Sequence, residues 1–237
     1  MKKKDREIFR RLQEAHPDAR CELDHETPFQ LLVSTVLSAQ ATDVQVNKVT
    51  KDLYAELPDC AAWLNLEIPE IEERIKSIGL YKSKAKNIHR LVRQIMEDHN
   101  GEVPHTMEEL TALSGVGRKT ASVVLANAFN IPAFAVDTHV FRLANRIGIT
   151  DEKDAGKTEQ ALLKAVDRDM WILCHHLLIF HGRRICSARN PKCGECNIAD
   201  LCKYYKTLTK KTAGKAKAQP LENQEDSAGA NLNDRSD

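Results

Sequence analysis

The sequence lacks long apolar runs and any marked excess of charge. The first absence argues against a membrane protein, and the second against a protein that binds nucleic acid through its overall charge. None of its stretches approaches the ~18 consecutive apolar residues that would suggest a membrane span. The formal net charge is +1, which argues against a protein that coats nucleic acid by overall charge, so a basic contact surface must be local. The basic N-terminus is followed by no apolar stretch, so we expect no secretory signal and a cytoplasmic location.

Strand-like alternation is also scarce, because apolar residues recur at a helical spacing of three to four along nearly the whole chain. The chain has 237 residues, enough to bury a core without disulfides in one or two domains. We therefore predict an all-α fold. Thr27 and Pro28 have the form of a helix N-cap followed by proline at the first helical position. The apolar run 29–37 after them predicts a helix at the centre of the core.

Start and stop residues predict further helices. Ser83 predicts the cap of a helix that runs to about Asn100 and is stopped by Gly101. Thr106, followed three residues later by Glu109, has the form of a capping box.

The composition changes near the end of the chain. Residues 207–237 are rich in Lys, Ala, Asn and Asp and show no apolar periodicity. Such a segment buries too little apolar surface to offset the entropy lost on ordering it. We therefore predict a tail that is disordered, with lysines that are solvated rather than bound to a partner.

Seven cysteines are present, and four of them lie within 17 residues near the C-terminal end. In a reducing compartment this crowding favours a metal site over disulfides. Four thiolates in one short loop suit an iron–sulfur cluster or a zinc ion, and chemistry alone leaves both open. The scattered cysteines are expected to be buried packing residues: Cys21, Cys60 and Cys174.

The segment 113–120 predicts a tight turn between two helices. Gly115 and Gly117 flank one apolar residue, so the backbone can turn sharply and leave free N–H groups at a helix N-terminus, where a phosphate binds well. A nucleotide-binding P-loop is excluded by spacing, because Arg118 separates Gly117 from Lys119 and a helix rather than a strand comes first. A plain helix–helix connection is the simplest alternative.

This segment, together with the run 136–140, resembles the helix-hairpin-helix motif and the following aspartate of DNA glycosylases, and the lysine variant resembles the endonuclease III family. The resemblance covers about residues 3–205. Family members usually have proline where this chain has Ser114, which should loosen the turn slightly.

The resemblance implies two catalytic residues. Lys119, in the first turn of a helix where the dipole disfavours an ammonium, would attack C1′ of the sugar and form a Schiff base. Asp137 would activate the lysine and stabilise positive charge on the sugar. Taken alone, Lys119 fits a phosphate contact and Asp137 fits an ordinary N-cap. His139 would support the site.

A glycosylase also needs side chains that fill the gap left by an extruded base. The segments 37–43 and 78–85 resemble those of endonuclease III, and they make Gln40 and Leu80 the expected wedges, with Ser38 and Asp43 lining the base pocket. A loop glutamine and a capping apolar contact are the alternatives for the two wedges. The hairpin residues expected to bind DNA are Gly115, Val116, Gly117 and Arg118.

The cysteine spacing resembles the [4Fe–4S] loop of endonuclease III, which favours iron over zinc. The implied ligands are Cys186, Cys193, Cys196 and Cys202. Arg189 and Lys192 lie between the first two ligands, so the loop would press a basic segment against DNA phosphates.

The resemblance implies two helical domains with the DNA site in a cleft between them: residues 22–133, and residues 1–21 with 134–206. It implies a monomer in the cytoplasm, associated with the nucleoid, that removes damaged pyrimidines from double-stranded DNA and acts as a lyase at abasic sites. An adenine-specific mismatch glycosylase is disfavoured because residues 31–42 contain no acidic residue. A non-catalytic hairpin module would not need both Lys119 and Asp137, and an iron–sulfur electron carrier would not need the hairpin.

Overall fold

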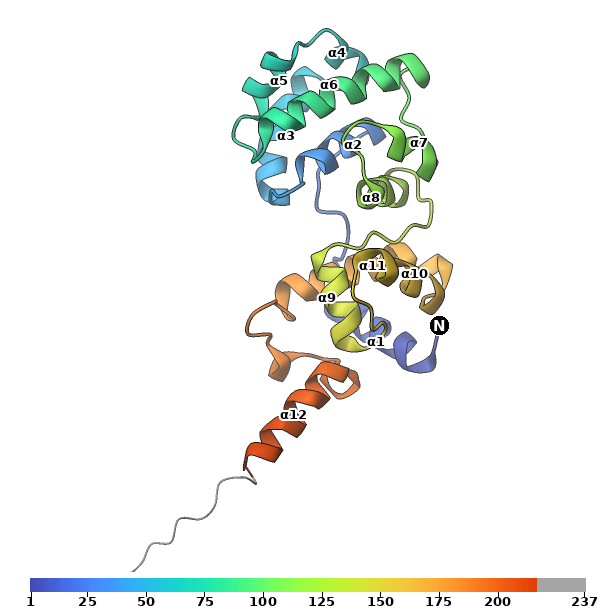
Figure 1. Ribbon diagram of the computed structural model, residues 1–237, viewed down its shortest axis with the longest axis vertical. Helices are drawn as coiled ribbons and strands as arrows, with labels where there is room; N and C mark the ends of the chain where they lie inside the picture. Colours follow the sequence, from blue (N-terminus) through green and yellow to red (C-terminus); the bar gives the residue numbers. More distant parts are fainter. Residues whose placement is uncertain (217–237) are drawn as a thin grey trace, which may run out of the picture.

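The computed structural model describes residues 1–216, and that part of the chain is helical with no strand (Figure 1). The all-α prediction is confirmed. In chain order the α-helices are α1 (Lys3–Ala15), α2 (Pro28–Leu37), α3 (Asp43–Glu56), α4 (Cys60–Leu64), α5 (Ile68–Ile75), α6 (Tyr81–Asp98), α7 (Met107–Ala112), α8 (Arg118–Ala128), α9 (Thr138–Ile147), α10 (Ala155–Ala165), α11 (Trp171–Arg184) and α12 (Lys203–Ala216). Three short 3₁₀ turns, η1 (Arg168–Met170), η2 (Cys193–Glu195) and η3 (Ala199–Leu201), complete the elements.

Two hydrophobic cores divide the molecule, one in each half of Figure 1. The first core takes its buried residues from between Leu23 and Ala133, and α2 lies at its centre against α3, α6 and α8. Every residue of α2 after Pro28 is buried, as expected for the apolar run 29–37. Thr27 caps this helix by accepting the Gln30 N–H at 3.2 Å, so the predicted start is confirmed.

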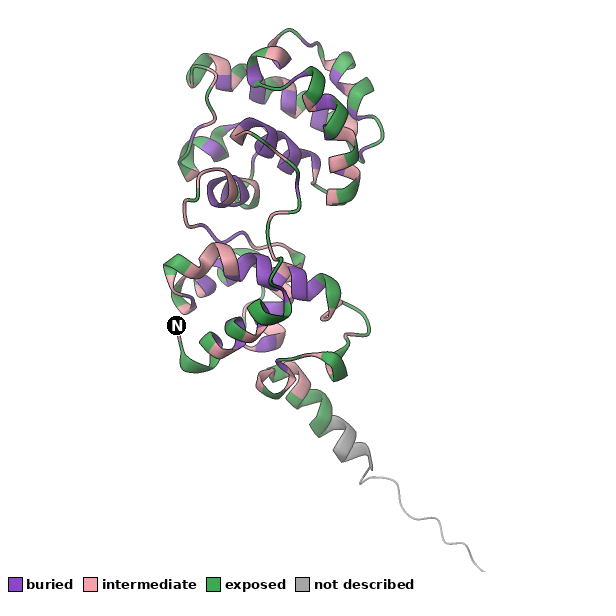
Figure 2. Cartoon of the chain, turned by 180° about the vertical axis from the view of Figure 1, so that it is seen from behind, coloured by how far each residue is buried: buried purple, intermediate pink, exposed green. Residues whose placement is uncertain are grey.

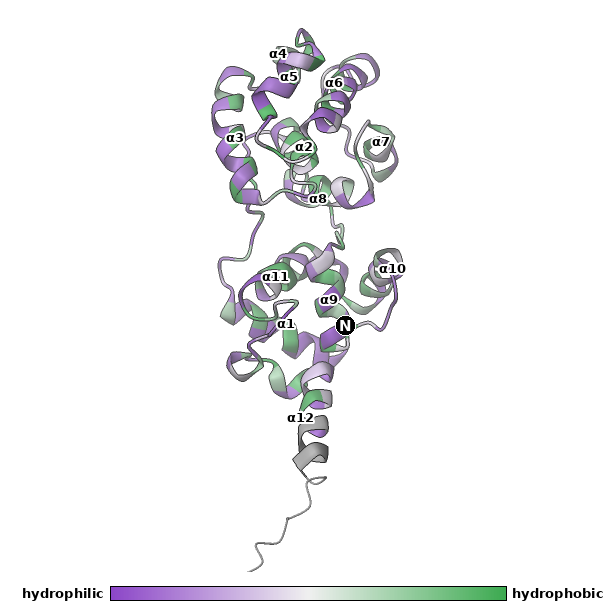
Figure 3. Cartoon of the chain, turned by 60° about the vertical axis from the view of Figure 1, so that its left-hand side comes forward, coloured by the Kyte–Doolittle hydropathy of each residue, from purple (hydrophilic) through white to green (hydrophobic). Residues whose placement is uncertain are grey.

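The second core joins the N-terminal helix α1 to helices from the C-terminal half, chiefly α9 and α11. Its buried residues include Ile8 and Leu12 of α1 and Leu177 and Leu178 of α11. Figure 2 shows the buried residues gathered inside each half, and Figure 3 shows polar residues on the outward faces of the helices. Two chain crossings, near residues 19–27 and 129–137, join the halves (Figure 1).

The predicted start of the helix at Ser83 is wrong. The N-cap position of helix α6 is Leu80, three residues earlier, because Leu80 adopts a left-handed conformation (φ 60°) and starts the helix at Tyr81 without a side-chain cap. The Ser83 hydroxyl instead donates to the Leu80 carbonyl at 2.9 Å. The helix ends at Asp98, before Gly101, whose φ of +82° suits the stop that was predicted there.

The predicted tail is wrong at its beginning. Helix α12 continues to Ala216, so residues 207–216 are helical and not disordered. The reason is that α12 contacts α9 and no proline interrupts the residues that follow, so the helix propagates although residues 206–210 are exposed. Residues 217–237 lie outside the described part of the chain, and the prediction for them is untested.

No helix in the described residues is both long and apolar enough to cross a membrane.

Thr106 caps α7 by accepting the Glu109 N–H at 3.2 Å, and its hydroxyl donates to the Glu109 carboxylate at 2.6 Å. The predicted capping pair is therefore present, although the carboxylate binds the hydroxyl rather than the backbone N–H of Thr106.

Candidate active site

The turn between α7 and α8 requires glycine at position 115, whereas position 117 has space for a side chain. Gly115 has a φ of +78°, and a Cβ at this position would stand 2.8 Å from Cβ of Asn87, so only glycine fits. Gly117 is the N-cap of α8, and a Cβ there would meet nothing within 4 Å. The open space beside Gly117 lies at the N-terminal end of the α8 dipole, where an anion is favoured.

Ser114 bonds the turn to α6, so the slight loosening expected from the missing proline is offset. Its N–H donates to the Gln94 side chain at 2.7 Å, a bond that a proline could not make. Its hydroxyl donates to the Asn87 side-chain oxygen at 3.3 Å. These two bonds replace the rigidity that a proline ring would supply.

Two residues of the predicted DNA-binding set have other contacts. Val116 is buried in the first core, and its N–H donates to the Leu113 carbonyl at 3.1 Å, so it is a packing residue of the turn. The Arg118 guanidinium binds Glu159 of α10, with Nη2 2.7 Å from the carboxylate. Because Glu159 is largely buried, this pair links the hairpin to the second core. Gly115 and Gly117 are exposed.

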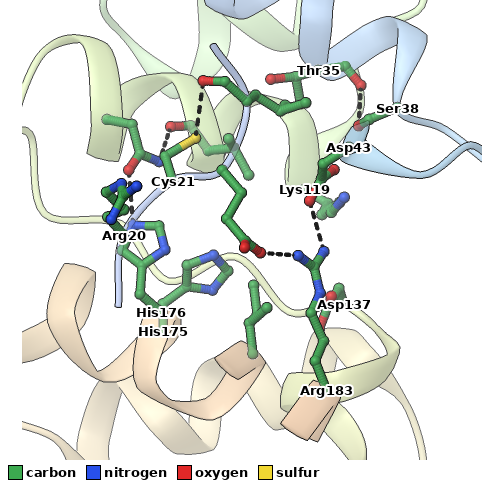
Figure 4. Close-up of a pocket in the computed structure, with 15 residues that line it drawn as sticks. Arg20, Cys21, Thr35, Ser38, Asp43, Lys119, Asp137, His175, His176 and Arg183 are labelled. Atoms are coloured by element: carbon green, nitrogen blue, oxygen red, sulfur yellow. Dashed lines mark hydrogen bonds and ion pairs between the residues drawn. The ribbon is translucent and has the colours of Figure 1, made fainter. Parts of the chain in front are cut away.

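A pocket of about 70 Å³ opens between the two cores, and both predicted catalytic residues line it (Figure 4). Lys119 comes from the first turn of α8, and Asp137 comes from the residue that precedes α9. The pocket thus brings together an amine from the first core and a carboxylate from the second, separated by 18 positions in the sequence.

Asp137 is the N-cap of α9, as its position suggested. Its Oδ1 accepts the Val140 N–H at 2.8 Å, which fixes the carboxylate at the edge of the pocket. Capping occupies one of the two carboxylate oxygens, and the other is the one that can serve the pocket. The two interpretations of Asp137 as a cap and as a reactive group are therefore compatible.

The two residues expected to line the base pocket lie together, whereas His139, expected to support the site, lies apart. Ser38 and Asp43 line the same pocket as Lys119. The Ser38 hydroxyl donates to the Thr35 carbonyl at 2.9 Å, and Asp43 accepts from Arg183 of α11 at 2.7 Å. His139 lies outside it, on the wall of an adjoining pocket.

His139 contacts the guanidinium of Arg142 on the same helix. Its Nδ1 lies 3.1 Å from the Arg142 guanidinium, which only donates, so Nδ1 accepts. Burial lowers the pKa of His139, and Arg142 and Arg183 lower it further against the opposing effect of Asp137.

The two expected wedges share an unusual backbone conformation. Gln40 and Leu80 are exposed, and both have a left-handed φ, 57° and 60° respectively, although neither is glycine. Their loops touch, since a Cβ on Gly79 would stand 3.7 Å from the Gln40 carbonyl. The buried Lys84 links these loops by donating to the Leu37 carbonyl at 2.8 Å, a contact that the sequence did not reveal.

Three polar pocket residues on α11 were not predicted from the sequence: His175, His176 and Arg183. Arg183 forms ion pairs with Asp43 and with Glu22, and so spans the pocket mouth from the second core to the first. The adjacent histidines were hidden within an apolar helical run, where a buried polar residue gives no periodic signal. Cys21, expected to be a buried packing residue, is only partly buried and lines this pocket, whereas Cys60 and Cys174 are buried as expected.

The cluster loop, residues 186–202, brings its four cysteines to one pocket lined mainly by apolar groups. None of the four forms a disulfide within the described part of the chain. Burial raises the pKa of Cys196, and the three other cysteines raise it further, as expected for sulfur atoms that face one centre. In the described residues, no three or more His, Cys, Asp or Glu side chains lie close enough together to hold a single metal ion. The four thiols fit an iron–sulfur cluster in their donor type and in sharing one apolar pocket.

Two arginines of α9 hold the start of the cluster loop. Arg146 donates to the Ser187 carbonyl at 2.7 Å and approaches Sγ of Cys186 at 3.5 Å, and Arg142 donates to the Cys186 carbonyl at 3.1 Å. The same helix carries Asp137 at its other end, so α9 connects the pocket to the cluster loop.

Arg189 and Lys192 are exposed on the cluster loop between the first two cysteines, as the sequence indicated. Asn190 between them has a left-handed φ of 50°, and the Ser187 hydroxyl donates to the Arg189 carbonyl at 2.6 Å. The basic segment is therefore a shaped loop whose side chains are free of the core.

Comparison with known proteins identifies the family. Residues 33–168 match the model of HhH-GPD superfamily base excision DNA repair proteins, and residues 186–202 match the iron–sulfur binding domain of endonuclease III. Endonuclease III of Escherichia coli (strain K12) is 50% identical over 203 residues, which cover 86% of this chain and 96% of the relative. Endonuclease III of Bacillus subtilis (strain 168) is 47% identical over 196 residues, covering 82% of this chain and 90% of the relative.

Solved structures agree with these relatives. A trapped covalent intermediate of endonuclease III with DNA has a TM-score of 0.83 and 42% identity, and the match covers 88% of this chain and 100% of that one. A thermostable thymine-DNA glycosylase has a TM-score of 0.77 and 25% identity, covering 86% and 98%. The chain therefore belongs to the endonuclease III family, base-excision repair DNA glycosylases and abasic-site lyases that bind DNA and carry a [4Fe–4S] cluster.

Proposed function

We propose that this chain excises oxidised or saturated pyrimidines from duplex DNA and then cleaves the strand 3′ to the lesion. The observation that carries the proposal is that Lys119 and Asp137, from different cores, line one pocket. The pocket is lined by residues of both chain crossings, Arg20 to Leu23 and Asp137, and by Ser38 and Asp43, which flank Gln40 in the sequence; this fits a site for an extruded base (Figure 4). Double-stranded DNA with a damaged pyrimidine or an abasic site is the proposed partner.

In the proposed mechanism the Lys119 amine forms a bond to C1′ while the bond from C1′ to the base breaks. The departing base takes the electron pair and a proton, and the sugar ring opens to an imine on the lysine. Loss of a C2′ proton then expels the 3′ oxygen by β-elimination, and water releases the lysine. The free oxygen of Asp137 would stabilise the positive charge that develops on the sugar, a role favoured by the partly enclosed pocket.

The DNA would be held by four groups of residues. Gln40 and Leu80 would enter the base stack, Gly115 and Gly117 would present backbone N–H groups to a phosphate, and the cluster loop would add Arg189 and Lys192. Arg118 would act indirectly, because Glu159 already holds its guanidinium. Ser38 and Asp43 would contact the extruded base.

For the cluster we propose Cys186, Cys193, Cys196 and Cys202 as the ligands. Its role is structural, because the bound cluster would fix the loop that carries Arg189 and Lys192. The division into residues 22–133 and residues 1–21 with 134–206 is proposed as two domains, supported by the two separate cores. We propose a monomer, since one chain supplies both sides of the pocket, working on the chromosome in the cytoplasm.

Borohydride trapping tests this function. Reduction of the imine would fix wild-type protein covalently on thymine-glycol or abasic duplex, with the link at Lys119 by peptide mapping. Lys119→Gln should bind the same DNA and trap nothing. Asp137→Asn keeps a capping side chain and removes the charge, so we expect folded protein with base excision slowed roughly 100-fold or more. Efficient trapping by Lys119→Gln would refute the nucleophile, and normal turnover by both variants would leave only a DNA-binding module.

A further inference from the structure

The adjacent histidines of α11 each hold a different segment of the active site. His175 is 3% exposed, and its Nδ1 lies 2.8 Å from the Ala135 carbonyl, two residues before Asp137. His176 is 7% exposed, and its Nε2 lies 2.8 Å from Oδ1 of Asn127. Asn127 lies on α8, the helix that carries Lys119.

The hydrogen-bond partners determine which ring nitrogen carries the proton. A carbonyl oxygen only accepts, so Nδ1 of His175 is the donor. The Asn127 amide is oriented by a second bond, because its Nδ2 donates to the Val123 carbonyl at 2.8 Å. The Asn127 oxygen must therefore accept from Nε2 of His176, and the two neighbouring rings carry their protons on different nitrogens.

Both rings line the pocket, and its charged groups shift the pKa of His175. They are packed edge to face with centroids 5.0 Å apart, and both line the pocket beside Lys119 and Asp137 (Figure 4). Burial lowers the pKa of His175 to about 4, with Asp137 opposing and Lys119 adding to the effect. Burial and His175 lower the pKa of His176 to about 3. Both are therefore neutral at pH 7.

One face of α8 connects the Asn127 bond of His176 to the Lys119 amine. Lys119, Val123 and Asn127 are spaced by four on α8, and all three line the pocket. A hydrogen bond at Asn127 therefore fixes the rotation of the face that carries Lys119. On the other side, Ala135 belongs to the extended segment that leads to Asp137, so its carbonyl bond fixes the start of α9.

We propose that His175 and His176 are a positioning pair that sets the separation between the Lys119 amine and the Asp137 carboxylate. One dipeptide in the second core binds the helix of the amine through His176 and the segment of the carboxylate through His175. Neither ring takes part in bond making. The inference rests on the proposed function, in which these two groups do the chemistry, and adds how they are aligned.

Matched variants separate positioning from packing. His176→Gln places an amide N–H near the position of Nε2–H, and His176→Leu removes the donor at similar size. His175→Asn and His175→Leu do the same for Nδ1–H. Cys174→Ala is the control for general loosening, because Cys174 is fully buried on the same helix and does not line the pocket. Asn127→Ala removes the acceptor and tests the same bond if His176→Leu folds poorly.

The readouts are single-turnover borohydride trapping on saturating abasic duplex, base excision on thymine-glycol duplex, DNA affinity, iron content and melting temperature. We expect His176→Leu and Asn127→Ala to slow trapping roughly 10- to 100-fold with DNA affinity unchanged, because about 1 Å of misplacement costs that much. His175→Leu should slow base excision similarly. The Gln and Asn variants should recover most of the rate, and Cys174→Ala should lower the melting temperature only.

Three results would overturn the pairing: folded Leu variants that react at the wild-type rate, conservative variants that recover nothing, or Cys174→Ala as slow as His176→Leu. Lys119→Gln, run alongside, keeps the two hypotheses apart. If Lys119→Gln traps DNA, the proposed function fails. If it does not trap and His176→Leu reacts normally, the positioning pair alone fails.

Discussion

Lys119 follows a turn that contacts with α6 in the first core hold in place, whereas Asp137 precedes a helix whose other end is bonded to the cluster loop. On the hairpin side, which comprises α7, α8 and the turn between them, Gly115, Ser114 and Val116 hold the shape through contacts within the first core. On the cluster side, which comprises α9, α11 and the cluster loop, distant residues and a cofactor are needed. The turn before Lys119 is therefore held within one core, whereas the segment of Asp137 is held between the second core and the cluster loop.

Loss of a cluster ligand should give the largest effect, confined at first to the cluster side. Cys193→Ser is expected to reduce iron from about four atoms per chain to near zero and to lower soluble yield, because the loop has little core of its own. Iron, sulfide and visible absorbance measure it. Cys60→Ser, a packing change in the first core, should keep its cluster; stoichiometric zinc without sulfide in the wild type would contradict the iron assignment.

Removal of an arginine that holds the loop should be the next largest effect. Arg146→Met keeps the stem and loses the bonds to Ser187 and Cys186, so we expect the cluster to be lost roughly 10-fold faster to a chelator. Loss of visible absorbance over time is the measurement. Arg93→Met, an exposed arginine of the first core, is the control, and equal cluster lifetimes would show that α9 does not support the loop.

A methyl group added at Gly115 should destabilise the hairpin side and leave the cluster side unchanged. Gly115→Ala forces a left-handed alanine against Asn87, so the free energy of unfolding should fall by about 1–2 kcal/mol or more, and affinity for abasic duplex should weaken. Urea unfolding and DNA titration measure the two effects. Gly117→Ala has space for its methyl group and should unfold nearly like wild type; equal losses in both variants would refute the distinction between the two glycines.

Acid should act on the cluster side through its neutral histidines, with the smallest effect. Burial holds the pKa of His175 at about 4 and of His176 at about 3, below the ordinary value of 6.5, so the unfolded chain binds more protons between those values. Stability should therefore be full above about pH 6.5 and fall as the pH drops toward 4. Melting temperature against pH should be shallower for His176→Gln, and an unchanged slope would contradict the linkage.

The sequence by itself determined the features that are encoded within a few residues. The cap at Thr27, the hairpin turn and the spacing of the four cysteines follow from local backbone and ligand rules, and their positions were predicted without a structure. The start of α6 was missed because Leu80 takes a conformation that propensity disfavours, and tertiary contacts overrode it.

Only the tertiary structure decided the partners of the long-range groups. The bond of Arg118 to Glu159, the burial of Val116 and the two histidines behind Lys119 and Asp137 join residues far apart in sequence. Sequence patterns repeat over three or four residues and report which face of a helix is buried, but they carry no record of what lies against that face. The separation of the two active groups is set by such cross-core contacts, because packing of one core against the other fixes distances that local rules leave free.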